Sequence, residues 1–418
     1  MEQKNAYLEA LGRSAKTASF ALRTASTGEK NRLLAAVRDS LLQQTELVLR
    51  ENEGDMRAAQ ANGLSPAMQD RLCLTPGRIQ AMAEAIDQII ALPDPVDQVL
   101  EGSTRPNGLQ IVKKRVSMGV VGVIYEARPN VTVDAAVLCL KAGNAVVLRG
   151  GKEAFHSNKA LVQVMRGALE QAGADPNSVC FVEDQSHEAA AQLMRMNGYL
   201  DLLVPRGSGR LISTVVQNAT VPVIETGVGN CHLYVDKSAD LSMATDILYN
   251  AKCSRPSVCN AVETLLVHKE IAAEFLPLAR AKLEEKQVEL RGCPAACALL
   301  PQALPASEED YATEFLDYIL AVRVVDGLEE AIQHIRRYSS GHSEAIVTSG
   351  YQEAEQFCQQ VDAAAVYVNA STRFTDGGEF GLGAELGIST QKLHARGPMG
   401  LEALTTTKYV IRGNGQIR

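Results

Sequence analysis

Short apolar runs alternate with stretches of helical spacing over most of the chain. A first series runs from GVVGVIYEARPN (119–130) through AVVLRGG (145–151), SVCFVED (178–184) and DLLVPRGSGR (201–210) to VPVIETG (221–227). A second series runs from CHLYVD (231–236) to AAVYVN (364–369). Strands that alternate with helices of about a dozen residues are typical of βαβ units. The pattern therefore predicts an α/β fold with parallel sheets.

The two ends of the chain follow other patterns. The first hundred residues are rich in Ala, Leu and Gln at helical spacing, and Pro66, Pro76 and Pro93 divide them into several helices. Near the other end, a Gly-rich stretch (370–391) precedes a single apolar strand, TTTKYVIRG (405–413), with no helix after it. We expect such a terminal strand to pair outside its own domain.

The composition excludes several classes of protein. Of 418 residues, 46% are hydrophobic and 22% are charged, as in soluble globular proteins of two or three domains. The net charge is −8 and no Lys/Arg block stands out, so neither nucleic acid nor an anionic membrane is an expected partner. No apolar run is long enough to span a bilayer, and the amphipathic start lacks the apolar core of a secretory signal. A small anionic substrate is compatible with this charge, because a few local arginines can bind one.

The nine cysteines do not form a recognisable framework. Their number is odd and their spacing irregular, so we expect no disulfides and a reducing, cytoplasmic location. Cys293 and Cys297 have no neighbouring His or second Cys pair, and we predict no metal site.

Two Gly-containing turns are candidates for binding an anion, although no strict G-x-G-x-x-G follows a strand. In PRGSGR (205–210), Gly207 and Ser208 lie where a strand leads into a helix, and backbone N–H groups at a helix start attract phosphate. In VLRGGK (147–152), Arg149 and Lys152 flank two glycines. An ordinary strand-to-helix turn explains the first motif equally well, and a solvated loop explains the second slightly better.

A candidate nucleophile lies in RPSVCNAVETLLVH (255–268). Cys259 follows Arg255 by four residues and has polar neighbours, surroundings that favour a thiolate. Cys253, Cys139 and Cys180 are interpreted as small core residues, because free cysteine packs as a hydrophobe. For Cys259, the residues alone leave a reactive and a structural role equally open.

A family resemblance joins these motifs. The segments YEARPNVT, LRGGKEA, VPRGS, VIETG, RPSVCNAVETLLVH and EFGLGAELGISTQKLHARGPMGLEAL together resemble the γ-glutamyl phosphate reductase family, within the aldehyde dehydrogenase superfamily. The most specific part is Val325 to Ile346, which carries the pattern V-x5-A-x-x-H-I-x-x-Y-S-S-G-H-S-E-x-I. With no amino-acid kinase domain before it, the chain is similar to the stand-alone bacterial members and not to the fused plant and animal forms.

The resemblance implies an aldehyde dehydrogenase-like architecture of three parts. Residues 1–100 and 121–230 would form a Rossmann-type NADP-binding domain, and residues 231–365 a catalytic α/β domain. Residues 101–120 and 366–418 would form a small β oligomerisation element, in which the segment near 101–120 pairs with the C-terminal strand. The same resemblance implies a homo-oligomer, a dimer or tetramer, and an association with glutamate 5-kinase.

The resemblance also implies a reaction. Cys259 stands where the superfamily has its nucleophile, and the substrate implied is L-glutamate 5-phosphate. Attack of the thiolate would release phosphate and leave a thioester, which NADPH would reduce to glutamate 5-semialdehyde. Asn130 matches the asparagine that, with the Cys259 backbone N–H, binds the oxyanion; the alternative is a helix N-cap. Glu225 matches the general base of aldehyde-oxidising members, although hydrolysis would waste the thioester here.

Further residues are assigned by the same resemblance. We expect the cofactor to contact seven residues: Arg149, Gly150, Lys152, Arg206, Gly207, Ser208 and Glu314. Glu314 matches a glutamate that contacts the nicotinamide ribose, but the E-x-F-G motif is replaced by Glu-Phe-Leu-Asp. Arg255 and His342 are candidate substrate contacts, and a structural role for His342 is at least as well supported.

Two other functions stay open. One is a non-phosphorylating semialdehyde dehydrogenase that uses NAD, which the 325–346 pattern disfavours. The other is a non-catalytic protein on the same fold, which the presence of Cys259 and Asn130 disfavours.

Overall fold

Two units make up residues 6–418, the part of the chain that this computed structural model describes. Unit 1 contains the chain through Thr226, together with Gly381–Gly387 and Met399–Arg418. Unit 2 contains Gly227–Phe380 and Ile388–Pro398. No helix in residues 6–418 has both the length and the apolar character needed to cross a bilayer.

Unit 1 begins with a run of helices whose starts are set by local sequence. Ser26 caps the second helix in a capping box with Glu29, and two later helices begin with Pro66 and Pro76 directly after Ser65 and Thr75. The two prolines therefore divide the helices as the sequence predicted. The helices are α1 (Ala6–Thr24), α2 (Thr27–Gln43), α3 (Thr45–Ala61), α4 (Pro66–Leu72) and α5 (Pro76–Ala91).

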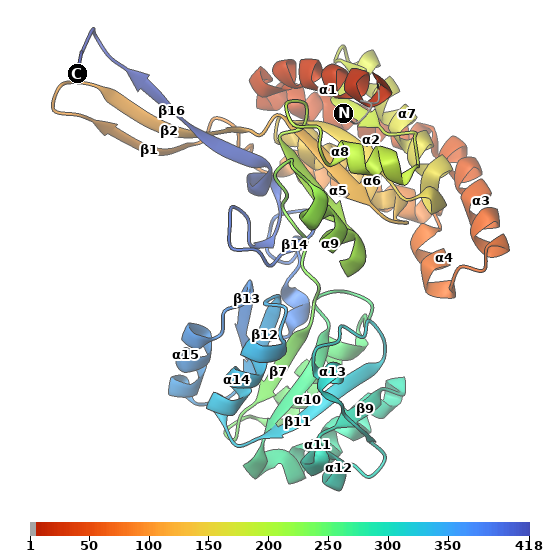
Figure 1. Cartoon of the computed structure of the whole chain (residues 1–418), viewed down its shortest axis with the longest axis vertical. Helices are drawn as coiled ribbons and strands as arrows, with labels where there is room; N and C mark the ends of the chain where they lie inside the picture. Colours follow the sequence, from red (N-terminus) through yellow and green to blue (C-terminus); the bar gives the residue numbers. More distant parts are fainter. Residues whose placement is uncertain (1–5) are drawn as a thin grey trace. The chain divides into compact units, whose positions relative to one another are not determined.

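A four-stranded parallel sheet forms the centre of unit 1 (Figure 1). Its order is β5-β4-β3-β6, and the carboxyl ends of its strands meet at one edge. The strands are β3 (Val120–Tyr125), β4 (Ala145–Arg149), β5 (Val179–Phe181) and β6 (Leu202–Arg206). The helices between and after them are α6 (Pro129–Lys141), η1 (Lys152–Ala154), α7 (Phe155–Gln171), η2 (Pro176–Ser178), α8 (His187–Leu193) and α9 (Gly209–Asn218).

The apolar run VPVIETG does not add a strand to this sheet. Only Val223 forms a bridge, with Leu203 of β6, although the backbone follows β6 from Pro222 to Ile224. Pro222 has no N–H to donate to a ladder, which explains why the pairing stops at one bridge.

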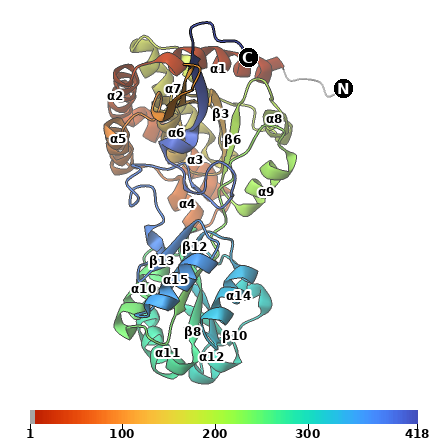
Figure 2. The same ribbon diagram turned by 90° about the vertical axis from the view of Figure 1, so that its left-hand side faces the viewer.

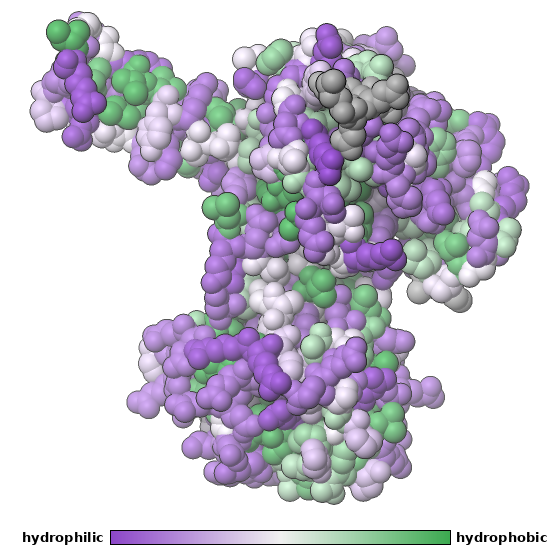
Figure 3. Space-filling view, in the orientation of Figure 1, coloured by the Kyte–Doolittle hydropathy of each residue, from purple (hydrophilic) through white to green (hydrophobic). Residues whose placement is uncertain are grey.

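A three-stranded antiparallel sheet completes unit 1. It consists of β1 (Val99–Thr104), β2 (Gln110–Ser117) and β16 (Thr405–Arg412), which follows η5 (Leu401–Leu404). The C-terminal strand pairs with β2 along its whole length, the pairing predicted from the sequence. Figure 1 shows these strands extending away from the rest of unit 1, and in Figure 2 they point toward the viewer. Their surface mixes polar and apolar residues (Figure 3), and its exposed large apolar side chains are Val99, Leu100, Tyr409 and Ile411.

Unit 2 is built on a seven-stranded parallel sheet of order β10-β9-β11-β8-β7-β12-β13. All residues of the central strands β7 and β8 are buried, as expected for a parallel sheet covered on both faces. The strands are β7 (Cys231–Val235), β8 (Val262–His268), β9 (Glu289–Gly292), β10 (Leu304–Pro305), β11 (Ile319–Val325), β12 (Ser343–Val347) and β13 (Ala365–Val368), and a separate pair is β14 (Ile388–Ser389) and β15 (Gly397–Pro398).

Helices cover both faces of this sheet. One apolar core lies under α10 and α11 and contains Phe275 and Leu248, and the other contains Ile332 and Phe357 from α14 and α15. The parallel sheets predicted from the alternating pattern are confirmed in both units. The helices are α10 (Leu241–Cys253), α11 (Lys269–Leu283), η3 (Glu284–Lys286), α12 (Pro294–Leu299), α13 (Glu308–Tyr311), α14 (Leu328–Tyr338), α15 (Tyr351–Gln360) and η4 (Thr372–Phe374).

Candidate active site

Cys259 lies in a turn of unit 2 between the end of α10 and the start of β8. Its side chain is half-buried, whereas Cys253 and Cys231 nearby are buried. Burial raises the pKa of Cys253 to about 11 and that of Cys231 well above its usual value. Because a thiol must ionise to act as a nucleophile, Cys259 is the thiol of this region whose exposure suits that chemistry. The prediction that Cys253, Cys139 and Cys180 are core residues is confirmed by their burial.

The backbone of the Cys259 turn presses against Gly229. A Cβ placed on Gly229 would lie 1.5 Å from the carbonyl oxygen of Cys259. Real Cβ atoms never come so close to another atom, so only glycine permits this approach of two backbone segments. The position of the Cys259 carbonyl therefore depends on residue 229, thirty positions earlier, having no side chain.

Gly229→Ala is expected to lower kcat by about 100-fold or more, because a shift of about 1 Å at a reacting group has that effect. Steady-state kinetics together with thermal melting would measure it. Gly167→Ala is the matched control, since a Cβ at that helical glycine meets nothing within 4 Å. Unchanged turnover in a folded Gly229→Ala protein would show that the position of the Cys259 turn is unimportant.

Polar contacts hold the turn in place. The Cys231 thiol donates to the Cys259 carbonyl oxygen at 3.2 Å. The hydroxyl of Thr372 donates to the Asn260 carbonyl oxygen at 2.7 Å, and the Asn260 amide donates to the Thr375 carbonyl oxygen at 2.9 Å. The turn is thus fixed at Cys259 and at the residue that follows it, which is the preorganisation that a nucleophile needs.

A buried ion pair joins the two elements that flank the turn. Lys252 of α10 and Glu263 of β8 are completely buried, and their charged atoms lie 2.6 Å apart. Burial raises the pKa of Glu263 to about 7, against the charge of Lys252, which lowers it. Removing one partner of such a pair costs about 3–5 kcal/mol, because it leaves a buried charge uncompensated.

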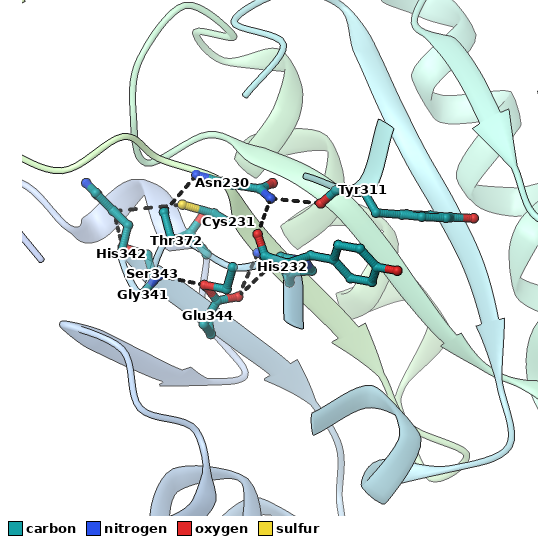
Figure 4. Close-up of polar contacts among 12 residues, drawn as sticks. Asn230, Cys231, His232, Tyr311, Gly341, His342, Ser343, Glu344 and Thr372 are labelled. Atoms are coloured by element: carbon teal, nitrogen blue, oxygen red, sulfur yellow. Dashed lines mark hydrogen bonds and ion pairs between the residues drawn. The ribbon is translucent and has the colours of Figure 1, made fainter. Parts of the chain in front are cut away.

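The pattern from Val325 to Ile346, the most specific part of the sequence, supplies further polar contacts near its C-terminal end. The Glu344 carboxylate accepts the His232 backbone N–H at 2.8 Å and the Ser339 hydroxyl at 2.5 Å. The Asn230 amide donates to the Tyr338 carbonyl oxygen at 2.7 Å. These contacts link the segment after α14 to Asn230 and to β7, which begins at Cys231 (Figure 4).

His342 takes part in this network. Its ring is completely buried, with Nδ1 2.8 Å from the Ser343 hydroxyl and 3.8 Å from the Cys231 sulfur. A direct substrate contact would require this burial to be lost, so the geometry favours the structural interpretation of His342.

Glu314 lies in unit 2, where its carboxylate accepts the Gly229 N–H at 2.7 Å. Burial raises its pKa, and this hydrogen bond opposes the shift. Glu314 therefore binds the backbone segment that packs against Cys259. Its contact with a nicotinamide ribose stays a prediction.

Arg373 also lies at the Cys259 turn, although the sequence analysis did not single it out. Its Nε donates to the Ser254 hydroxyl at 3.1 Å, and its Nη1 donates to the Asn260 side-chain oxygen. Burial lowers the pKa of Arg373, the charge of Arg255 lowers it further, and the Cys259 thiol raises it. The only sequence signal was a single cation in the Gly-rich stretch 370–391, which nothing local distinguishes from a solvated residue.

Asn130 belongs to unit 1 and lies in the first turn of α6. The helix begins at Pro129 after the N-cap residue Arg128, so the N-cap interpretation of Asn130 is wrong. Its side chain is exposed, and its amide donates to the Asp134 carboxylate at 3.0 Å. Burial raises the pKa of Asp134 to about 6, against the Asn130 hydrogen bond and the charge of Arg206, which lower it. An exposed amide held in one orientation is suited to donate to a substrate oxygen.

Glu225 is half-buried near the end of unit 1. The backbone before it is tied to β6, since Ile224 N–H donates to the Leu203 carbonyl oxygen at 3.0 Å. After it, the Thr226 hydroxyl donates to the Pro205 carbonyl oxygen at 3.0 Å. The segment is well fixed, and a catalytic role for Glu225 stays a prediction.

Two cations follow β4 at the carboxyl edge of the unit 1 sheet. Arg149 donates to the carbonyl oxygens of Gln185 and Ser186, and Lys152 is exposed at the start of η1. The Nε of Arg149 is buried with no hydrogen-bond acceptor among the described residues. Gly150 packs against Asn158, whose side-chain nitrogen would lie 2.2 Å from an added Cβ. This edge of the sheet therefore carries two positive charges and, at Gly150, a backbone with no side chain between it and Asn158.

At the start of α9 a carboxylate already occupies the expected anion position. The Glu126 carboxylate accepts the Ser208 N–H at 2.8 Å and the Ser208 hydroxyl at 2.7 Å. A Cβ on Gly207 would also meet this carboxylate, at 2.6 Å. The turn binds an anion as the sequence suggested, but the anion is the protein's own side chain, and a phosphate could bind there only after Glu126 turns away.

Comparisons with known proteins place this geometry in context. Residues 5–294 match the model of the aldehyde dehydrogenase family. A γ-glutamyl phosphate reductase of Carboxydothermus hydrogenoformans is 62% identical over 98% of this chain and 98% of its own length. One from Enterococcus faecalis is 58% identical over 98% of this chain and 99% of its own. The crystal structure of γ-glutamyl phosphate reductase from Thermotoga maritima is 47% identical, covers 98% of this chain and 99% of that one, and has a TM-score of 0.96.

Proposed function

The chain belongs to the γ-glutamyl phosphate reductase family, within the aldehyde dehydrogenases, and on that premise we propose that it reduces L-glutamate 5-phosphate to L-glutamate 5-semialdehyde with release of phosphate. This is the second step of proline biosynthesis. The observation that carries the proposal is the Cys259 turn, in which the thiol is half-buried and the backbone carbonyls of Cys259 and Asn260 accept hydrogen bonds from Cys231 and Thr372.

Each proposed residue has a distinct task. The Cys259 thiolate attacks the carbonyl carbon of the acyl phosphate, the C–O bond to phosphate breaks, and a thioester forms. The Asn130 amide, with the Cys259 backbone N–H, binds the negative oxygen that forms during attack. When bound, NADPH would supply the hydride that reduces the thioester. Glu225 has no hydrolytic task in this reaction, because water attack on the thioester would yield glutamate instead of the aldehyde.

The residues at the carboxyl edge of the unit 1 sheet fit a nicotinamide dinucleotide phosphate. The buried Arg149 Nε has no hydrogen-bond acceptor among the described residues, and Lys152, three residues later, is exposed. We propose that these two cations bind the 2′-phosphate of NADPH, with Gly150 allowing close approach. Arg206, Gly207 and Ser208 would contact the remaining phosphates once Glu126 moves, and Glu314 would contact the ribose.

Lys152→Glu is expected to raise the KM for NADPH by about 10- to 100-fold and that for NADH far less, because a charged hydrogen bond contributes about 1.5–3 kcal/mol. Steady-state kinetics with both cofactors would measure the difference. Lys237→Glu, at an exposed lysine of unit 2, is the charge-matched control. Equal effects on NADPH and NADH would mean that Lys152 does not read the 2′-phosphate.

The decisive test of the function measures the reverse reaction. Glutamate 5-semialdehyde and NADP should yield NADPH only when inorganic phosphate is present, because phosphate must release the acyl group from Cys259. NADPH formation without phosphate would instead identify a non-phosphorylating dehydrogenase.

We propose a homo-oligomer formed through the β1-β2-β16 sheet. Every residue of β1 is exposed, and the exposed apolar side chains of Tyr409 and Ile411 are suited to burial against a second copy. We also propose a reducing cytoplasmic location, because the number of cysteines is odd and their spacing is irregular. An association with glutamate 5-kinase would shorten the path of the acyl phosphate.

A further inference from the structure

Two arginines belong to the Cys259 turn: Arg255 is part of it, and the Arg373 guanidinium is hydrogen-bonded to Ser254 and Asn260 at its two ends. Arg373 and Arg255 interact closely enough that the charge of Arg255 lowers the pKa of Arg373. The hydrogen-bond partners of Arg373 are neutral oxygens of Ser254 and Asn260. Asp376 raises the pKa of Arg373, but its carboxylate accepts the N–H groups of Gly378 and Glu379. Like charges held together cost free energy, so this arrangement favours an anion that joins them.

The position of Arg373 is fixed by the backbone around Cys259. The Asn260 amide donates to the Arg373 carbonyl oxygen at 3.3 Å, and the neighbouring Thr372 hydroxyl donates to the Asn260 carbonyl oxygen at 2.7 Å. The guanidinium therefore bridges Ser254 and Asn260, the two ends of the turn that contains Arg255 and Cys259. A cation held at both ends of this turn is preorganised at the segment that carries Cys259.

Substrate chemistry identifies the anion. In an acyl phosphate, the phosphoryl group is joined by one oxygen to the carbonyl carbon that the thiolate attacks. The α-carboxylate of glutamate 5-phosphate is separated from that carbon by three further carbons. Arg373, which is hydrogen-bonded to both ends of the turn that carries Cys259, is therefore placed for the phosphoryl group and not for the carboxylate.

We propose that Arg373, together with Arg255, binds the phosphoryl group of the substrate and stabilises it as the leaving group. This inference rests on the proposed function and names the residue that handles the phosphate. When the Cys259 sulfur forms its bond to the carbonyl carbon, the C–O bond to phosphorus breaks and its electron pair passes to the departing phosphate. Arg373 holds the oxygen on which that charge accumulates, and in the reverse direction it binds the inorganic phosphate that attacks the thioester.

The reverse reaction separates the two candidate anions, because phosphate and the carboxylate-bearing aldehyde enter as different substrates. Arg373→Gln is expected to raise the KM for inorganic phosphate by about 10- to 100-fold. The KM for glutamate 5-semialdehyde should stay within about twofold of the wild-type value, and Arg373→Lys should restore part of the phosphate affinity. Arg336→Gln, at an exposed arginine of α14, is the matched control and should behave as the wild type.

A second measurement needs neither turnover nor cofactor. Cys259 is alkylated with anionic iodoacetate and with neutral iodoacetamide, and the ratio of the two rates is compared. A change in thiolate fraction affects both reagents equally, so the ratio reports the positive charge beside the sulfur. Arg373→Gln should lower the ratio, and inorganic phosphate should protect Cys259 from iodoacetate in the wild type more than in the variant.

The possible outcomes are distinct. An unchanged phosphate KM and an unchanged alkylation ratio in Arg373→Gln would overturn the inference. A rise confined to the KM for the semialdehyde would assign Arg373 to the carboxylate and also overturn it. If wild-type aldehyde oxidation proceeds without phosphate, the proposed function itself fails, which the wild-type assay reveals before any variant is made.

Discussion

Cys259→Ala is expected to lower kcat on the order of 10⁶-fold, the scale on which loss of a catalytic nucleophile acts. The reason is chemical: without the thiolate no thioester forms, and the thioester is the species that accepts the hydride. The half-buried side chain lies in a turn held by its backbone, so the fold should survive the substitution. Turnover with NADPH and a thermal melt on the same preparation would measure both effects.

Cys253→Ala is the matched control for this experiment. It removes a thiol six residues away in the sequence, at the end of the helix that leads into the turn. Because burial raises the pKa of Cys253 to about 11, little of it is ionised at neutral pH, and its loss should leave most activity. Near-wild-type rates in Cys259→Ala would remove the thioester from the mechanism.

Asn130→Ala is expected to lower kcat by about 100- to 1,000-fold, the effect of losing one donor to an oxyanion. The KM for NADPH should change little, because the amide is proposed to contact the reacting oxygen. The melting temperature should also change little, since Arg128 and not Asn130 is the N-cap of α6. Steady-state kinetics and thermal melting would measure the three quantities.

The control for Asn130→Ala is Asn218→Ala in α9. Asn218 is also exposed, and its amide likewise makes a local helical contact, donating to the Thr214 carbonyl oxygen at 2.7 Å. Its replacement should leave kcat unchanged. A loss of stability without a loss of kcat in Asn130→Ala would show that the Asp134 contact, and not catalysis, is what Asn130 provides.

The sequence predicted the strands whose apolar runs are long and unbroken. β3, with the sequence VVGVIY and every residue buried, is an example, because burial on both faces of a parallel sheet demands continuous apolar sequence. It over-predicted a strand in VPVIETG, where Pro222 removes a donor from the ladder. The two-residue strand β10 at Leu304–Pro305 could not be predicted, since its pairing depends on the neighbouring β9 and not on its own pattern.

The sequence likewise indicated only some of the candidate site residues. The family resemblance singled out Cys259 as a candidate, because its local sequence alone left a structural role equally open. Arg373 could not be identified from the sequence, since it reaches Ser254 across 119 residues of sequence and only the fold brings the two together. Glu126 was also missed, because the turn at Ser208 suggested an anion without revealing that a residue 82 positions earlier supplies it.

The division of the chain also sets the order in which its parts can be finished during synthesis. Arg115 of β2 and Thr405, at the start of β16, are hydrogen-bonded, yet they are 290 residues apart. At about 5–20 residues per second, a ribosome needs roughly 15–60 s to deliver β16 after β2 has emerged. Unit 1 also receives Gly381–Gly387 and Met399–Arg418 only after the main segment of unit 2 has been made. The half of the protein that starts first is therefore completed last, and the open edge of β2 must wait through the synthesis of the entire Cys259 region.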